Sequence, residues 1–173
     1  EEAGAGDQRP DGIDRAGFGR AEAAGVLDDF ISDVKAAGSR DEVIQASLSF
    51  LASYCRRAAF FILKRGVIEG FDALGPNLSL DQVKSIWIPL SSRSTLCEAI
   101  ASKRIRVGPI GDTRVDAIFC AALGGRKGDS IIIPLKIANR VVSALYGDDL
   151  RGSAPSMQDI QTISDTLSDV LSK

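Results

Sequence analysis

Three cysteines, Cys55, Cys97 and Cys120, are the side chains of this sequence best suited to covalent chemistry. Thiol chemistry requires a thiolate with a lowered pKa and a second thiol that resolves the intermediate. An odd number of cysteines at wide spacing argues against a disulfide framework. The alternative is that all three are small buried hydrophobic residues without a chemical role.

The sequence contains no histidine, and this absence excludes more than any residue present suggests. A haem with a histidine ligand, a zinc site with histidine ligands and a Ser-His or Cys-His catalytic pair all require that side chain. Most hydrolase mechanisms are therefore excluded. We predict no catalytic residue, no metal site and no cofactor, and expect a protein that is not an enzyme.

Basic side chains gather in the second half of the chain, where they could hold an anionic ligand. They are Arg104, Arg106, Arg114, Arg126 and Lys127. The same spacing is common on solvated surfaces, which is the alternative interpretation. The glycine-rich segment 124–128 resembles a phosphate loop only superficially, because it lacks the terminal Gly-Lys-Ser/Thr and a following helix.

Length and composition are those of one globular domain. The chain has 173 residues, of which 45% are hydrophobic and 25% charged, and its net charge is -2. Without a global basic field we expect no nucleic-acid partner, and without a long apolar run we expect no membrane contact. Because residue 1 is Glu rather than Met, we expect either a processed cytoplasmic chain or a fragment, and the fragment fits a module of a larger protein.

Hydrophobic periodicity predicts an α+β domain at residues 26–173. The segment 1–25 is rich in small and charged residues and is predicted to be a disordered linker or tail. Two amphipathic helices follow at 26–37 and 39–54. Ser39 is placed to cap the second of them.

Apolar runs bounded by turn residues predict about six strands, with short helices between some of them. The predicted strands span 58–64, 67–74, 86–90, 104–110, 131–137 and 141–146. Arg65-Gly66 joins the first two as a hairpin. A helix is expected at 94–102 and a closing helix after Ser156, whereas 113–123 suits either a helix or an irregular loop.

Five short motifs follow one another in the order found in GAF domains, and the chain resembles that family over residues 26–172. The motifs are Ile88-Pro89-Leu90, 96–103 (LCEAIASK), 105–109 (IRVGP), 132–135 (IIPL) and 142–148 (VSALYGD). The resemblance implies a GAF-like central antiparallel sheet. It also implies N- and C-terminal helices on one face and a pocket on the other, covered by the segment 91–123. We expect Cys97, Arg106, Cys120 and Tyr146 to bind the ligand.

The resemblance implies two alternative functions. The first is a non-catalytic regulatory or sensory module of a larger bacterial-type signalling protein, working through protein contacts. The second is a thiol-dependent enzyme like the free-methionine-sulfoxide reductases, since Cys97 and Cys120 fall close to two of the reductase cysteines. Trp87 stands where the reductase partner cysteine would lie, and Ser130 stands where the reductases have glutamate. We therefore favour the regulatory module.

Other ligands of the family are disfavoured by the residues present. Cys97 could correspond to the cysteine that attaches a bilin, but the histidine that normally follows is Glu98. The Asn-Lys-Phe-Asp-type set that binds cyclic nucleotides does not occur. A third possibility is a purely structural dimerisation domain whose cavity is filled by Trp87, Ile88, Phe119 and Leu145.

The closing helix carries an apolar stripe that suits either its own sheet or the same helix of a second copy. The helix at 26–37 has a similar apolar stripe, which must also be buried against another element. We predict a homodimer in contact with other domains of the parent protein or with a partner protein. The predicted interface residues are Leu27, Phe30, Ile31, Ile160, Ile163, Leu167 and Val170.

Overall fold

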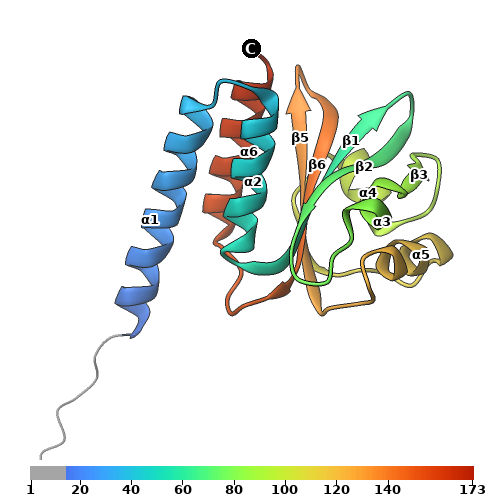
Figure 1. The fold of residues 1–173 in the computed structure, drawn as a ribbon, viewed down its shortest axis with the longest axis horizontal. Coiled ribbons are helices and arrows are strands. Elements are labelled where there is room, and N and C mark those ends of the chain that lie inside the picture. The colour runs from blue at the N-terminus through green and yellow to red at the C-terminus, as the bar shows by residue number, and fades with distance from the viewer. Residues whose placement is uncertain (1–14) are drawn as a thin grey trace, which may run out of the picture.

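One antiparallel sheet with helices on both faces makes up the protein (Figure 1). The structure is a computed structural model that describes the backbone of residues 15–173 and the side chains of residues 24–173. The helices are α1 (Arg15–Ala36), α2 (Arg40–Ala52), α3 (Leu80–Lys84), α4 (Thr95–Ser102), α5 (Arg114–Ala122) and α6 (Met157–Leu171). The strands are β1 (Cys55–Lys64), β2 (Val67–Leu74), β3 (Trp87–Pro89), β4 (Arg106–Pro109), β5 (Asp129–Ile137) and β6 (Arg140–Leu150).

The six strands run in the order β3-β2-β1-β6-β5-β4, and every neighbouring pair is antiparallel. Two tight hairpins set this register. Arg65-Gly66 closes β1–β2 and Ala138-Asn139 closes β5–β6, each with positive φ at both residues. Positive φ at both central residues is the conformation that matches the twist of paired strands in two-residue hairpins. The predicted Arg65-Gly66 hairpin is confirmed.

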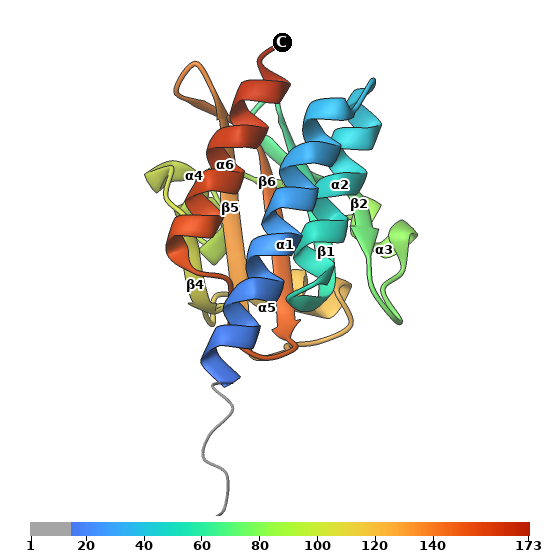
Figure 2. The ribbon, with the colours of Figure 1, turned by 90° about the vertical axis from the view of Figure 1, so that its left-hand side faces the viewer.

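The sheet separates two layers of side chains (Figures 1 and 2). Helices α2 and α6 cover one face of the sheet and α1 packs on the outside of these two helices, whereas α3, α4 and α5 lie on the other face, which we call the roof side. Successive strand residues alternate between the two cores: Ile131 and Ile133 pack toward the long helices, and Ile132 packs toward the roof. The predicted α+β fold with helices on one face and a covering segment on the other is confirmed.

Polar caps fix where the helices begin. Ser39, Ser94 and Ser156 each accept a hydrogen bond from a backbone N–H in the first turn of α2, α4 and α6. The segment that the sequence left open as helix or loop is α5. Thr113 and Asp116 form a reciprocal capping box at its start.

Helix α1 begins at Arg15, whereas the sequence predicted a start at Val26. The predicted tail of residues 1–25 therefore overlaps this helix, and its first fourteen residues lie outside those described. The segment 15–25 is rich in Ala and Gly, so it shows no amphipathic pattern of large apolar residues that would predict a helix. Alanine nevertheless has a high intrinsic helix propensity. Within the described chain, no helix is long and apolar enough to cross a membrane.

Four of the predicted dimer residues belong to the core of their own chain. Phe30, Ile160, Ile163 and Leu167 are buried in the core cluster to which the long helices and the sheet contribute. They pack as an ordinary core requires, so they offer no surface to a second copy. Leu27, Ile31 and Val170 are only partly buried against the same core. A dimer through α1 and α6 stays a prediction that rests on these three.

Candidate ligand site

A cavity of about 240 Å³ lies on the roof side, where β5 and β6 meet the loop that follows α5. Its polar lining consists of Cys120, Arg126, Lys127, Asp129, Tyr146 and Asp148. Pro109, the last residue of β4, and Ile110, which follows it, also line the cavity. The cavity therefore carries side chains of both charges together with a phenol and a thiol.

Asp148 is held in place by Arg57 from the neighbouring strand. Arg57 Nε donates to Asp148 Oδ1 at 2.7 Å and Nη2 to Oδ2 at 2.6 Å. The same guanidinium donates to the carbonyl oxygens of Leu123 and Gly125, in the loop after α5. Burial disfavours the charge of Arg57, but hydrogen bonding to Asp148 and its negative charge outweigh burial and raise the pKa of Arg57. Arg57 therefore stays charged in this ion pair.

Tyr146 connects the ion pair to the aromatic part of the roof. Its hydroxyl donates to Asp148 Oδ2 at 2.6 Å, and its ring meets Phe119 of α5 edge-on at 5.1 Å between centroids. Burial, followed by the charge of Asp148, raises the pKa of Tyr146. The phenol consequently stays protonated and acts as a hydrogen-bond donor.

The three cysteines are separated by the fold. Cys120 lines the cavity, whereas Cys97 Sγ donates to the Pro89 carbonyl at 3.5 Å in another part of the roof. Cys55 packs in the core beneath the long helices. Burial raises the pKa of all three thiols, that of Cys55 to about 12. Protonated thiols are weak nucleophiles.

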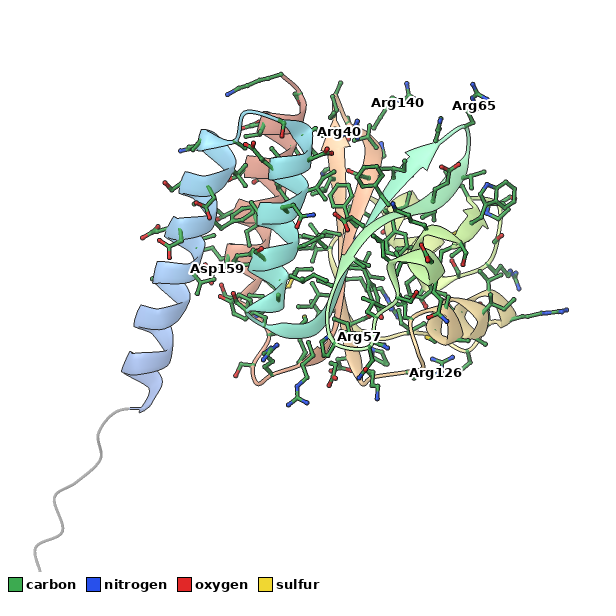
Figure 3. The ribbon with its side chains drawn as sticks, in the orientation of Figure 1. Arg40, Arg57, Arg65, Arg126, Arg140 and Asp159 are labelled. Carbon is green, nitrogen blue, oxygen red and sulfur yellow. The ribbon has the colours of Figure 1, made fainter. Side chains whose placement is uncertain are left out.

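Two of the four predicted ligand residues, Cys120 and Tyr146, line the cavity. Cys97 does not line it, and neither does Arg106, whose Nη1 donates to the Pro109 carbonyl. Arg126 does line it, and its guanidinium also anchors the chain before α5 through the carbonyls of Ile110 and Gly111. Figure 3 shows Arg57 and Arg126 at the same end of the molecule.

The four side chains expected to fill the cavity do not act together. Phe119 and Ile88 are buried in the roof-side core, but Leu145 belongs to the core on the opposite face. Trp87 is 61% exposed and lines a groove of about 230 Å³ between β3 and α5. The prediction that these side chains fill the cavity is therefore wrong for Leu145 and Trp87. Strand alternation places Leu145 on the opposite face of the sheet, and Trp87 is exposed on the edge strand β3.

Two buried charged residues that organise the site were not selected from the sequence. Asp116 accepts from the Thr95 amide at 2.8 Å and from Thr113 Oγ1 at 2.9 Å, and so joins the starts of α4 and α5. The spacing Thr113-x-x-Asp116 was the available signal, since it fits a capping box. For Arg57 the sequence signal was weaker, because Arg56 and Arg57 are two adjacent arginines at the edge of an apolar run.

Comparison with solved structures shows the same fold in proteins of two kinds. The GAF domain of a phosphoenolpyruvate-protein phosphotransferase from Coxiella burnetii matches with a TM-score of 0.69 at 13% identity, over 87% of this chain and 93% of that one. The GAF domain of A. aeolicus nlh2 in an inactive state matches with a TM-score of 0.58 at 12% identity, over 88% and 94%. Free methionine-R-sulfoxide reductase from Neisseria meningitidis, in complex with its substrate, matches with a TM-score of 0.67 at 17% identity, over 92% of each chain.

No family model matches the sequence, and no curated protein matches it either. The chain thus has the fold of a GAF domain with a divergent sequence.

Proposed function

We propose that this chain is a GAF-type regulatory module that binds a small polar ligand beside Tyr146 and Asp148 without turning it over. The cavity itself is the observation that carries the proposal. Arg126 and Lys127 line it together with Asp129 and Asp148, so it offers partners to both charges of a zwitterion. Its volume of about 240 Å³ lies below the range of about 300–1,000 Å³ that is usual for larger ligands.

An amino acid or a close derivative fits this combination of size and charge. The reductase from Neisseria meningitidis, by its name, acts on free methionine-R-sulfoxide, which is such a derivative. In this chain the carboxylate of the ligand would face Arg126 and Lys127, and its ammonium group would face Asp148 or Asp129. These contacts would be charge-assisted hydrogen bonds, which are stronger than hydrogen bonds between neutral groups.

Arg57 supplies a route from the ligand to the rest of the domain. A ligand that binds Asp148 competes with Arg57 for this carboxylate. It thereby changes the hydrogen bonds that Arg57 donates to the Leu123 and Gly125 carbonyls. Arg57 also lies on β1, the strand that directly follows α2. We infer that the response passes to the long helices and from there to a second copy and to other domains of a bacterial-type cytoplasmic signalling protein.

A thiol-dependent reductase is the second candidate, and one observation favours it: Cys120 lines the cavity. Against it, Cys97 does not line the same cavity, and burial raises the pKa of both thiols. A reductase needs one thiolate to attack and a second thiol to resolve the product.

Two measurements on the same protein separate the candidates. Thermal unfolding is followed with each common amino acid and with free methionine sulfoxide, and one of them should raise the melting temperature by several degrees because binding stabilises the folded state. Methionine sulfoxide is then incubated with protein and dithiothreitol, and no methionine should form. Turnover that disappears in Cys120→Ser would establish the reductase and refute the non-catalytic module.

A further inference from the structure

A second cavity lies at the opposite end from the candidate ligand site and has a volume of about 680 Å³. It sits where α1 ends, α2 begins, α6 ends and the β5–β6 hairpin turns. Figure 3 shows Arg40 and Arg140 at this end and Arg57 and Arg126 at the other. We call this cavity the helix-end cavity.

The floor of the helix-end cavity is apolar. It is formed by Val34, Val43, Ile137, Val142, Val170 and Leu171. Val34 and Val43 are buried, whereas the other four remain partly exposed. Exposed apolar surface that is gathered in one concave place marks a binding site more often than scattered apolar residues do.

The rim of the helix-end cavity is cationic. Lys35, Arg40 and Lys173 line it, and no acidic side chain does. Within the described residues, none of these three cations forms an ion pair. Asp41 and Glu42, at the start of α2, line a neighbouring groove, and the Glu42 carboxylate accepts a hydrogen bond from the Gly38 amide at 2.7 Å, at the edge of the helix-end cavity.

We propose that the helix-end cavity binds a free amphiphilic carboxylate, that is, an anionic head on an unbranched or aromatic apolar body. The head would lie between Lys35 and Arg40, whose guanidinium can hold a carboxylate with two parallel hydrogen bonds. The body would cover the apolar floor, where burying each methylene group contributes to affinity. A volume of about 680 Å³ falls within the range of about 300–1,000 Å³ typical of small-molecule sites.

Charge complementarity and shape together select this class of ligand. An inorganic anion would satisfy the rim but leave the floor in water, and a neutral hydrocarbon would cover the floor but leave the cations without a partner. The ligand would contact α1, α2 and α6 at once, because each contributes to the lining. Its binding is independent of the cavity beside Tyr146, so the two proposals can fail separately.

The test uses decanoate as the probe, below the concentration at which it forms micelles, with the whole chain and isothermal titration calorimetry. Saturable binding with one site is expected, and decan-1-ol should bind at least about tenfold more weakly because it lacks the charge. Acetate should give no heat at the same concentrations. Raising the salt concentration should weaken the binding of decanoate but not that of decan-1-ol.

Variants locate the site. Lys35→Gln combined with Arg40→Gln should weaken decanoate about tenfold, and Val142→Glu should do the same by placing a negative charge in the cavity. Arg65→Asn is the matched control: Arg65 lies at the same end of the molecule on the β1–β2 turn, outside the lining, and its removal should leave affinity unchanged. Circular dichroism checks that each variant is folded.

Three results would overturn the proposal. They are no binding of decanoate at about 1 mM, equal binding of decanoate and decan-1-ol, and binding that is unchanged in both the Lys35→Gln/Arg40→Gln variant and Val142→Glu.

Discussion

Arg57 on β1 and Asp148 on β6 stand opposite each other in the strand register and form an ion pair through two hydrogen bonds of 2.7 and 2.6 Å. Their side chains are only 7% and 3% exposed. The same guanidinium holds the Leu123 and Gly125 carbonyls, and the same carboxylate accepts from Tyr146. One buried pair therefore links the sheet, the wall of the candidate ligand site and the loop after α5.

Replacing Arg57 by Met should destabilise the protein by about 3–5 kcal/mol, because Asp148 would be left buried without its cation. Chemical denaturation followed by circular dichroism measures this free energy. Arg56→Met is the matched control: Arg56 precedes Arg57 on the same strand and is exposed, so a change within about 0.5 kcal/mol is expected. Equal losses in the two variants would mean that the pair does not organise the site.

Asp116 should matter in a similar way for the roof. Asp116→Ala removes the acceptor for the Thr95 amide and for Thr113, and a loss of about 2–4 kcal/mol is expected from a buried charged acceptor at a helix cap. The control is Asp112→Ala, since Asp112 is fully exposed and lies 3.6 Å from Arg126 in a surface ion pair. Such pairs contribute about 0–1 kcal/mol. A loss for Asp116→Ala as small as that for Asp112→Ala would contradict the role given to Asp116.

Cys55 should make stability depend on pH in the alkaline range. Burial first, then the charges of Asp148 and Asp149, raise the pKa of Cys55 from its ordinary value of 9.0 to about 12. The folded chain thus keeps the neutral thiol while the unfolded chain ionises, so this contribution is complete below pH 9.0 and is lost as the pH rises toward 12.

Denaturation of the wild type and of Cys55→Ala at several pH values checks this dependence. The stability difference between the two proteins should be constant below pH 9.0 and should shift against the wild type between pH 9.0 and 12. A difference that stays the same across that interval would show that Cys55 ionises normally in the folded chain.

The proposed homodimer can be tested without disturbing the core. Ile163 and Leu167 are fully buried, so a charge there would unfold the chain rather than separate two copies. Leu27 and Ile31 are partly exposed on α1, and Leu27→Glu with Ile31→Glu should convert a dimer to a folded monomer in light scattering. Asp28→Lys, at an exposed position of the same helix, should leave the dimer intact. A wild type that is monomeric at micromolar concentration would end the proposal.

Local sequence signals predicted most of the architecture. Arg65-Gly66, Ser39 and Ser156 act within a few residues of the elements that they shape, so a single sequence is enough to recognise them. The start of α1 was missed because it depends on helix propensity rather than on an apolar stripe.

The site was harder to predict because it depends on pairings between distant parts of the chain. Arg57 meets Asp148 only through the register of β1 with β6, and it meets Leu123 only because α5 folds back over the sheet. Cys97 and Arg106 were expected in the same pocket as Cys120 because they lie in the covering segment, but the helical turn and the edge strand direct them elsewhere.

The binding of an amino acid in the cavity beside Tyr146 is the central claim, and amide chemical-shift mapping by NMR tests it most directly. The isotope-labelled chain is titrated with the common amino acids and with free methionine sulfoxide. At least one of them should saturate and move the amide signals of Gly128, Asp129 and Asp148, and Tyr146→Phe should weaken that effect. Saturating concentrations that leave these signals unmoved, or that move only signals at the opposite end of the molecule, would contradict the account.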